Sequence, residues 1–259
     1  MALWPLSCII VVEHMDFTLD KYAELLSALK SYEFEELTLR HDVDKRPENS
    51  LRTAQMEAEM GMRGIYYFRA VPESWDEVVI KAIAALGHEI GYHYESLTTC
   101  QGDVDAAYED FCRNLERLRA LVPVRSICMH GSPRSPYDSK DIWKKYDYRT
   151  LGIEFEPYLD TDFSQTFYLT DTGRRWDGFR VSVRDRIPVY QEEWVKQGLV
   201  FHTTDDVIAG LNQGRIPRRL MMTVHPQRWN PFGVVWCEEL ALQRAKNFVK
   251  YWKIKKNQT

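Results

Sequence analysis

Residues 37–44 read Leu-Thr-Leu-Arg-His-Asp-Val-Asp, and this stretch decides the fold class. An apolar run of this length predicts a buried strand from Leu37 to Val43. Pro47 follows at a position where the first turn of a helix tolerates proline, and apolar residues then recur on one helical face. A strand followed at once by an amphipathic helix is the repeating unit of an α/β protein.

The same unit recurs along the chain. Further strands are predicted over residues 64–70, 89–94, 125–129 and 220–224, with amphipathic helices between them. Strands that alternate with helices favour parallel pairing, and the number of units suggests a barrel that is irregular through its middle third. A final helix carries an apolar face that we expect to pack inward, at Leu242, Ala245, Val249 and Trp252.

Length and composition narrow the possibilities. A chain of 259 residues suits a single α/β domain over residues 1–259. The formal net charge of −4 argues against a nucleic-acid-binding surface. Five irregularly spaced cysteines without a C-x-x-C pair favour a reducing, cytoplasmic compartment. The apolar segment 1–12 is too short to span a membrane, and a start at Met15 would make residues 1–14 excess sequence.

Ionisable groups follow the apolar runs at four places along the chain. In parallel β/α proteins the carboxyl ends of the strands build the active site, so we expect these groups to converge. The four segments are Arg40-His41-Asp42-Val43-Asp44, His88-Glu89-Ile90-Gly91-Tyr92-His93, Met129-His130-Gly131-Ser132-Pro133 and Thr223-Val224-His225-Pro226.

Asp42 and Asp44 are the first candidates for chemistry. Residues two apart on a strand point to the same side, and two neighbouring carboxylates repel unless a cation or a shared proton intervenes. The repulsion would be relieved if one of the two carboxylates bound a metal ion and the other acted as a base. The alternative is a solvated turn in which Lys45 and Arg46 neutralise the pair.

His93 is the second candidate, because a neutral imidazole beside a carboxylate is common ligation for zinc. The alternative is a buried histidine bonded to a backbone carbonyl. We apply that structural interpretation to His88, which begins its strand, and we treat His14 and His202 as structural or exposed.

Taken together, the segments HDVD, GHEIGYH, MHGSP and TVHP resemble the polysaccharide deacetylases (carbohydrate esterase family 4, the NodB-homology fold). The resemblance runs from about Leu37 to Pro226 and implies an irregular (β/α) barrel of about seven strands. It implies that Asp42 is the general base, that Asp44 and His93 bind a divalent metal, most often zinc, and that His225 is the general acid.

One position departs from the family pattern. The family places a second metal-binding histidine four residues after the first, and here that residue is Leu97. Either another residue supplies the third ligand, or metal binding is weak or absent. His130 is the best substitute, because it should end the neighbouring strand, and Glu95 is a second candidate. We therefore predict that His130 approaches Asp44 and His93.

Substrate-binding residues are expected in two loops and at one tryptophan. The resemblance implies a groove-lining loop from Ser132 and Pro133 to Tyr137. The segment 168–176 is rich in groups that contact sugars, or is an ordinary aromatic-lined loop. The candidates from that segment and from the aromatic residues beyond it are Asp171, Arg175, Trp176 and Trp229.

The leading expectation is hydrolysis of an amide, most simply an N-acetyl group on a sugar. Two alternatives stay open. The chain could be a non-catalytic glycan-binding or regulatory protein on a deacetylase scaffold, or it could hydrolyse a small non-sugar amide or cyclic imide. The sequence gives no indication of oligomeric state.

Overall fold

The computed structural model describes residues 15–132, 135–180, 182 and 185–256, and for 249–256 it describes the backbone alone. The question of whether the chain starts at Met1 or Met15 concerns residues 1–14, which lie outside this range.

The core of the fold is one parallel sheet. Its hydrogen-bonded order is β4-β3-β2-β1-β6-β5, so β1 lies near the centre. The strands are β1 (Glu36–Val43), β2 (Ile65–Phe68), β3 (Glu89–Tyr94), β4 (Val124–Met129), β5 (Phe167–Thr170) and β6 (Arg219–Val224).

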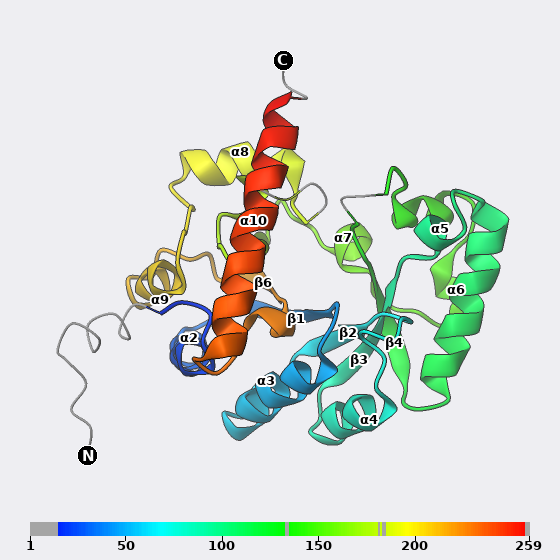
Figure 1. Cartoon of the computed structure of the whole chain (residues 1–259), viewed down its shortest axis with the longest axis horizontal. Coiled ribbons are helices and arrows are strands. Elements are labelled where there is room, and N and C mark those ends of the chain that lie inside the picture. The colour runs from blue at the N-terminus through cyan, green and yellow to red at the C-terminus, as the bar shows by residue number, and fades with distance from the viewer. Residues whose placement is uncertain (1–14, 133–134, 181, 183–184, 257–259) are drawn as a thin grey trace.

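Helices connect the strands and surround the sheet (Figure 1). Within the described chain, no helix is both long and apolar enough to cross a membrane. The α-helices are α2 (Leu19–Ser31), α3 (Pro47–Glu59), α4 (Glu77–Ala85), α5 (Ser96–Thr99), α6 (Val104–Arg119), α7 (Pro157–Asp160), α8 (Pro188–Lys196), α9 (Thr204–Asn212) and α10 (Val234–Lys256). Short 3-10 helices are η1 (Ser139–Lys144), η2 (Tyr148–Leu151), η3 (Gly178–Arg180) and η4 (Pro226–Arg228).

The strand pairing confirms the predicted parallel α/β architecture, but it does not confirm a closed barrel or a seventh strand. Strands β4 and β5 stand at the two ends of the hydrogen-bonded order. Beyond β4, Phe155 forms an isolated parallel bridge with Ser126. The chain after β4 runs through η1, η2 and α7 before it reaches β5, which leaves this one bridge in place of a further strand among the residues described.

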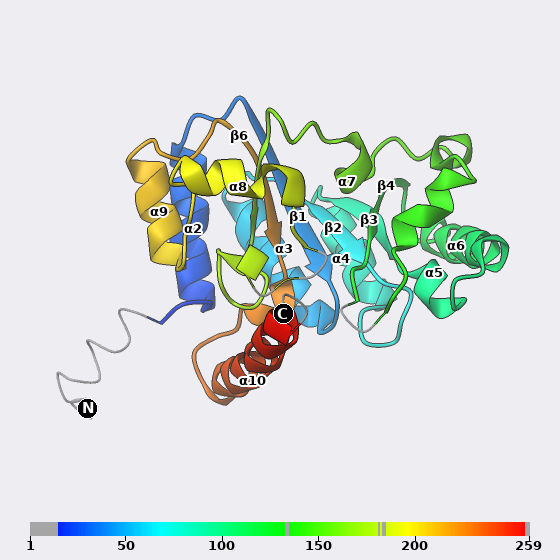
Figure 2. The same ribbon diagram turned by 90° about the horizontal axis from the view of Figure 1, so that it is seen from above.

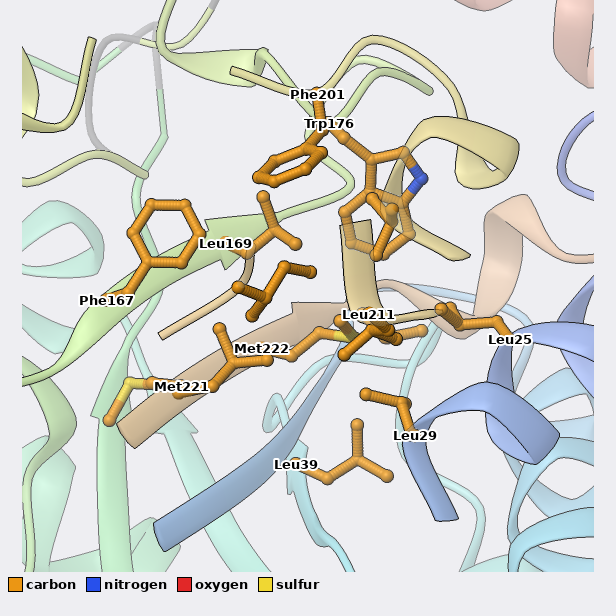
Figure 3. Packing of buried hydrophobic residues seen from close by; sticks show 14 of the residues in the cluster. Leu25, Leu29, Leu39, Phe167, Leu169, Trp176, Phe201, Leu211, Met221 and Met222 are labelled. Atoms are coloured by element: carbon orange, nitrogen blue, oxygen red, sulfur yellow. The ribbon is translucent and has the colours of Figure 1, made fainter. Parts of the chain in front are cut away.

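Alternation along the strands divides the sheet into an apolar outer face and a polar inner face. On β1, Leu39 and Val43 are buried among apolar residues, whereas Arg40 and Asp42 lie on the other side. One outer core joins β1, β5 and β6 to α2 and α9, and includes Trp176 (Figure 3). A second core joins β2, β3 and β4 to α3, α4 and α6.

A polar cluster around Glu57 of α3 interrupts the apolar outer face. The Glu57 carboxylate accepts hydrogen bonds from the hydroxyls of Tyr22 (2.5 Å) and Tyr66 (3.0 Å) and lies 2.7 Å from His41 Nε2. Burial and the neighbouring carboxylate raise the pKa of both tyrosines well above the usual value, so both stay protonated and donate. The cluster therefore ties α2 and α3 to the sheet by buried polar contacts.

Glu57→Ala is expected to lower the free energy of unfolding by about 3–5 kcal/mol, because it removes the acceptor of two buried tyrosine hydroxyls and the carboxylate beside buried His41. Chemical denaturation measures the change. Glu59→Ala, on the exposed side of the same helix, is the matched control and should change stability by less than about 0.5 kcal/mol. Equal effects of the two variants would contradict the importance of the cluster.

The final helix does not pack as the sequence predicted. The side chain of Leu242 is 53% exposed and Ala245 is also exposed, while Glu239 and Gln243 are buried. Val249 and Trp252 belong to the part of α10 whose side chains are not described. The orientation has a physical reason: α10 lies against the loops that follow β1 and β5, which present polar groups (Figure 2).

Candidate active site

The candidate groups converge at the carboxyl ends of β1, β3 and β4. Strand β2 lies between β1 and β3, and its Tyr67 stands in register with Asp42 on one side and Gly91 on the other. A Cβ at Gly91 would lie 2.3 Å from the Tyr67 ring, so only glycine leaves room for that ring. With the ring accommodated there, His93 on β3 reaches the carboxylates that end β1.

Asp44, His93 and His130 approach one another as predicted. Asp44 Oδ1 lies 3.7 Å from His93 Nε2 and 3.5 Å from His130 Nε2. One potential ligand atom from each of the three side chains lies within 4.8 Å of the others. Sequence order alone had placed His130 on the strand next to that of His93, and the pairing of β3 with β4 confirms that placement.

His93 is held as a neutral imidazole with a defined tautomer. Its Nδ1 lies 2.9 Å from the carbonyl oxygen of Cys128, which can only accept, so Nδ1 carries the proton. Burial lowers the pKa of His93 to about 4. The Nε2 lone pair therefore faces Asp42 and Asp44, each 3.7 Å away.

His130 is oriented by a carboxylate on the neighbouring strand end. Its Nδ1 lies 2.9 Å from Glu95 Oε2, and Arg69 at the end of β2 donates to Glu95 Oε1 at 2.6 Å. Burial opposes ionisation of Glu95, but the hydrogen bond from His130 and the charge of Arg69 lower its pKa to about 2. A histidine whose Nδ1 donates to a carboxylate presents Nε2 as a ligand atom, an arrangement common in metal sites. Glu95 thus supports His130 and does not replace it.

Asp42 is fixed by an arginine from its own strand. Arg40 Nε and Nη2 donate to the two Asp42 oxygens at 2.8 and 2.6 Å, and both residues are buried. Burial alone would raise the pKa of Asp42, but the Arg40 charge more than offsets it and lowers the pKa to about 2. Asp42 is therefore ionised, and its Oδ2 points towards His93.

The Asp44, His93 and His130 group fits a divalent cation. Asp44 Oδ1 is buried and has no hydrogen-bond partner among the described residues. It lies 3.7 Å from Nε2 of His93 and 3.5 Å from Nε2 of His130, an arrangement of one carboxylate oxygen and two imidazole nitrogens that suits a divalent cation. Ligand atoms at about 2.0–2.2 Å from a tetrahedral zinc lie about 3.4 Å apart, close to the 3.5 and 3.7 Å found here.

A second possible ligand group consists of Asp42, His93 and Cys128. It fits a cation less well, because Asp42 is already paired with Arg40. Burial also raises the pKa of the Cys128 thiol well above its usual value, which opposes the thiolate that a metal would need.

His225 follows β6 and is oriented by Asp171, which follows β5. The Asp171 carboxylate lies 2.6 Å from His225 Nδ1 and also accepts from Arg228 and Trp229. Burial and the Arg228 charge oppose protonation of His225, yet Asp171 raises its pKa. Asp171 is fully buried. This geometry argues against the substrate contact predicted for Asp171 and gives it a positioning role instead.

A pocket of about 450 Å³ opens beside Asp44 and His130. Ser132 lines it, in agreement with the predicted groove loop, whereas Pro133 lies outside the described residues. Gln227 also lines the pocket and donates to Asp44 Oδ2 at 2.9 Å, which leaves Oδ1 turned to the histidines. Residues Glu239, Gln243 and Lys246 of α10 form one wall.

Two other predicted substrate residues lie away from this pocket. The ring of Tyr137 covers Gly102, where a Cβ would approach it to 2.5 Å. Arg175 donates to Asp177 at 2.6 and 2.8 Å. Neither side chain is among the residues that line the pocket.

Trp176 and Trp229 are core residues, which argues against the predicted stacking on a sugar. Trp176 is 3% exposed, and its Nε1 donates to Thr204. Trp229 is fully buried, with its ring 4.8 Å from Phe17 and 4.9 Å from Tyr22. No ring face of either tryptophan is open to a ligand.

The histidines that we interpreted as structural lie elsewhere. His88 accepts from the backbone of Gly64 and donates to Ala54, beside the Glu57 cluster. His202 pairs with Asp177. His14 lies outside the described residues.

Sequence reasoning missed Arg40 and Gln227. Arg40 carried a signal, because the rule that places Asp42 and Asp44 on one side of β1 places Arg40 there too. Gln227 carried none, since its contact with Asp44 depends on how β6 pairs with β1.

Compared with known proteins, the chain matches no family model and no curated protein. Its assignment therefore rests on the residues and geometry of the site.

Proposed function

We propose that this protein is a metal-dependent hydrolase of a non-peptide carbon–nitrogen bond, and that its substrate is an N-acetylated sugar or glycan. The observation that carries the proposal is the buried Asp44 oxygen facing two histidine nitrogens, with ionised Asp42 beside them. On this proposal the chain is a divergent polysaccharide deacetylase in which His130 replaces the histidine missing at Leu97.

Asp44, His93 and His130 would hold the ion, which we propose to be zinc. When bound, it would supply Lewis acidity towards the substrate carbonyl. The histidines are suited to this role because the Cys128 carbonyl and Glu95 fix their tautomers.

Asp42 and His225 would divide the proton transfers. Asp42, ionised and held by Arg40, would take the proton of the attacking water. His225 would give a proton to the departing amine. Asp171 occupies its Nδ1 and raises its pKa, so Nε2 is the nitrogen left for the substrate.

The pocket lining favours a second candidate, an amidohydrolase acting on a small non-sugar amide. Sugar sites usually present aromatic ring faces, and the described residues that line this pocket include none. A volume of about 450 Å³ also lies in the range of small-molecule sites. The non-catalytic alternative is less well supported, because Asp44 Oδ1 is buried without a hydrogen-bond partner among the described residues, at a place where the cation of a hydrolase would lie.

Metal analysis of the purified protein, paired with acetate release from N-acetylated sugars, tests the proposal. One equivalent of metal and metal-dependent acetate release from a sugar are expected. Turnover confined to small amides or cyclic imides would favour the second candidate. A protein that holds stoichiometric metal on neither purification nor reconstitution, and that hydrolyses neither panel, would overturn the proposal.

Glu95→Ala is expected to weaken divalent-metal affinity by about 10–100-fold, because His130 loses the carboxylate that fixes its tautomer. Competition with a chelating dye measures the affinity. Glu95→Gln keeps an acceptor for His130 and should weaken binding less. Unchanged affinity in the alanine variant would show that His130 is not a ligand.

A further inference from the structure

Asp185, which follows η3, is a carboxylate to which the proposed mechanism gives no role. Burial would raise the pKa of Asp185, but the charges of His225 and Arg40 and its hydrogen bonds lower it below the usual value, so the carboxylate is ionised. Two hydroxyls donate to each of its oxygens. The donors are Tyr158 and Tyr168 to Oδ1, and Thr170 and Thr172 to Oδ2.

Alternation along β5 and the register of the sheet place these hydroxyls near Arg40. Leu169 points into the outer core (Figure 3), so Thr170 beside it points to the inner face. Thr170 stands in register with Thr223 of β6, and Thr223 stands in register with Arg40 of β1. Asp185 therefore binds on the same face of the sheet that carries Arg40.

The hydroxyl of Tyr158 joins Asp185 to Arg40. It lies 3.0 Å from Asp185 Oδ1 and 3.2 Å from Arg40 Nη2. Burial raises the pKa of Tyr158 well above its usual value, so the hydroxyl keeps its proton. A carboxylate can only accept and a guanidinium can only donate, so the hydroxyl donates to Asp185 and accepts from Arg40. The Tyr158 ring also lies over the guanidinium, with its centroid 4.7 Å from Cζ.

The orientation of Arg40 matters because this side chain binds both oxygens of Asp42. Its Nη1 is buried and has no hydrogen-bond partner among the described residues. Apart from Asp42, the guanidinium contacts that the structure describes are those with Tyr158 and a more distant one with Tyr67, whose ring centroid lies 6.0 Å from Cζ. A movement of Arg40 would therefore move the Asp42 carboxylate with it.

We propose that Asp185 and Tyr158 are positioning residues, which fix the Arg40 guanidinium and through it the carboxylate of Asp42. Asp185 sets the direction of the Tyr158 hydroxyl, and this hydroxyl holds Arg40 Nη2. Neither residue is among those that line the pocket beside Asp44. The effect on turnover rests on the function proposed above, whereas the hold on Arg40 does not.

Hydrogen exchange at Arg40 tests this hold without any substrate. In protein with isotope-labelled arginine, the resonance of the Arg40 Nε–H is identified by its absence in Arg40→Lys. Asp185→Asn and Tyr158→Phe should each speed the exchange of this proton at least about tenfold, because each removes a hydrogen bond to a charged group. Tyr146→Phe is the matched control, since it removes a tyrosine hydroxyl that donates to Asp105 of α6, and it should leave the exchange unchanged.

Steady-state kinetics tests the effect on turnover. Asp185→Asn and Tyr158→Phe should each lower kcat by about 10- to 100-fold with little change in KM, because a displaced base affects the transition state more than substrate binding. Metal content should stay at the wild-type level, since neither residue belongs to a group of potential ligands. Tyr146→Phe should keep the wild-type kcat.

Unchanged exchange at Arg40 in Tyr158→Phe would overturn the proposal, and this variant decides the question alone if Asp185→Asn does not fold. Faster exchange with an unchanged kcat, on a substrate that the wild type hydrolyses, would overturn the role in turnover. A wild-type protein that hydrolyses neither sugars nor small amides would contradict the proposed function instead. The exchange at Arg40 would then still show whether Asp185 and Tyr158 position it.

Discussion

Asp44→Ala is expected to leave the purified protein without stoichiometric metal while its fold survives. Asp44 contributes a carboxylate oxygen that faces both His93 and His130, and two histidines alone hold a divalent ion poorly. The side chain is 26% exposed and, among the residues that the structure describes, it has one side-chain hydrogen bond, from Gln227, so its loss should cost little stability. Elemental analysis measures the metal content, and circular dichroism checks the fold.

Glu73→Ala is the matched control for this experiment. Glu73 lines the same pocket as Asp44 but belongs to neither group of potential ligands. The control should keep its metal. An Asp44→Ala protein with full metal occupancy would show that the ion, if bound, is held elsewhere.

Asp42→Asn is expected to lower turnover by about 10² to 10⁴, the usual effect of removing a general base. Metal content should stay near that of the wild type, because Asp42 is paired with Arg40 and is not needed as a ligand. Steady-state kinetics with a saturating substrate measures the loss. Near-normal turnover in this variant would rule out Asp42 as the base.

The buried pairing of Asp42 with Arg40 requires a second variant. Asp42→Asn leaves the Arg40 guanidinium buried without a counter-charge, which can cost about 3–5 kcal/mol of stability. The double variant Arg40→Gln/Asp42→Asn removes both charges and should regain part of that stability. If it also regained activity, the loss in the single variant would reflect unfolding and not chemistry.

The residues at the carboxyl ends of the strands could be predicted from the sequence, because simple rules of strand geometry and strand order place them. Alternation along β1 put Asp42 and Asp44 on one side, and the order of the units put His130 beside His93. Both rules use only the positions of residues within strands and the order of the strands along the chain. Neither rule depends on the conformation of the loops.

The aromatic residues and the last helix could not be placed in this way. A tryptophan after a strand, such as Trp176 or Trp229, is equally compatible with a groove and with a core, and only packing against Phe17 and α9 decides between them. The periodicity of α10 predicted an inward apolar face, and the exposed Leu242 and Ala245 show that this prediction was wrong. The orientation of α10 depends on the polar surface that it covers, where Glu239 pairs with Lys45 and Asn247 donates to the Gly173 carbonyl.

The origin of the three candidate ligands also bears on how the protein moves. Asp44, His93 and His130 come from the ends of three different strands, with α3, β2 and α4 between the first two along the chain and α5 and α6 between the last two. A ligated ion would therefore join segments that the backbone leaves free to open separately. The apolar cores hold the global fold without it, so its effect would fall on local opening at the strand ends. The strand ends that carry Asp44, His93 and His130 would then be more rigid when the metal ion is bound than when it is absent.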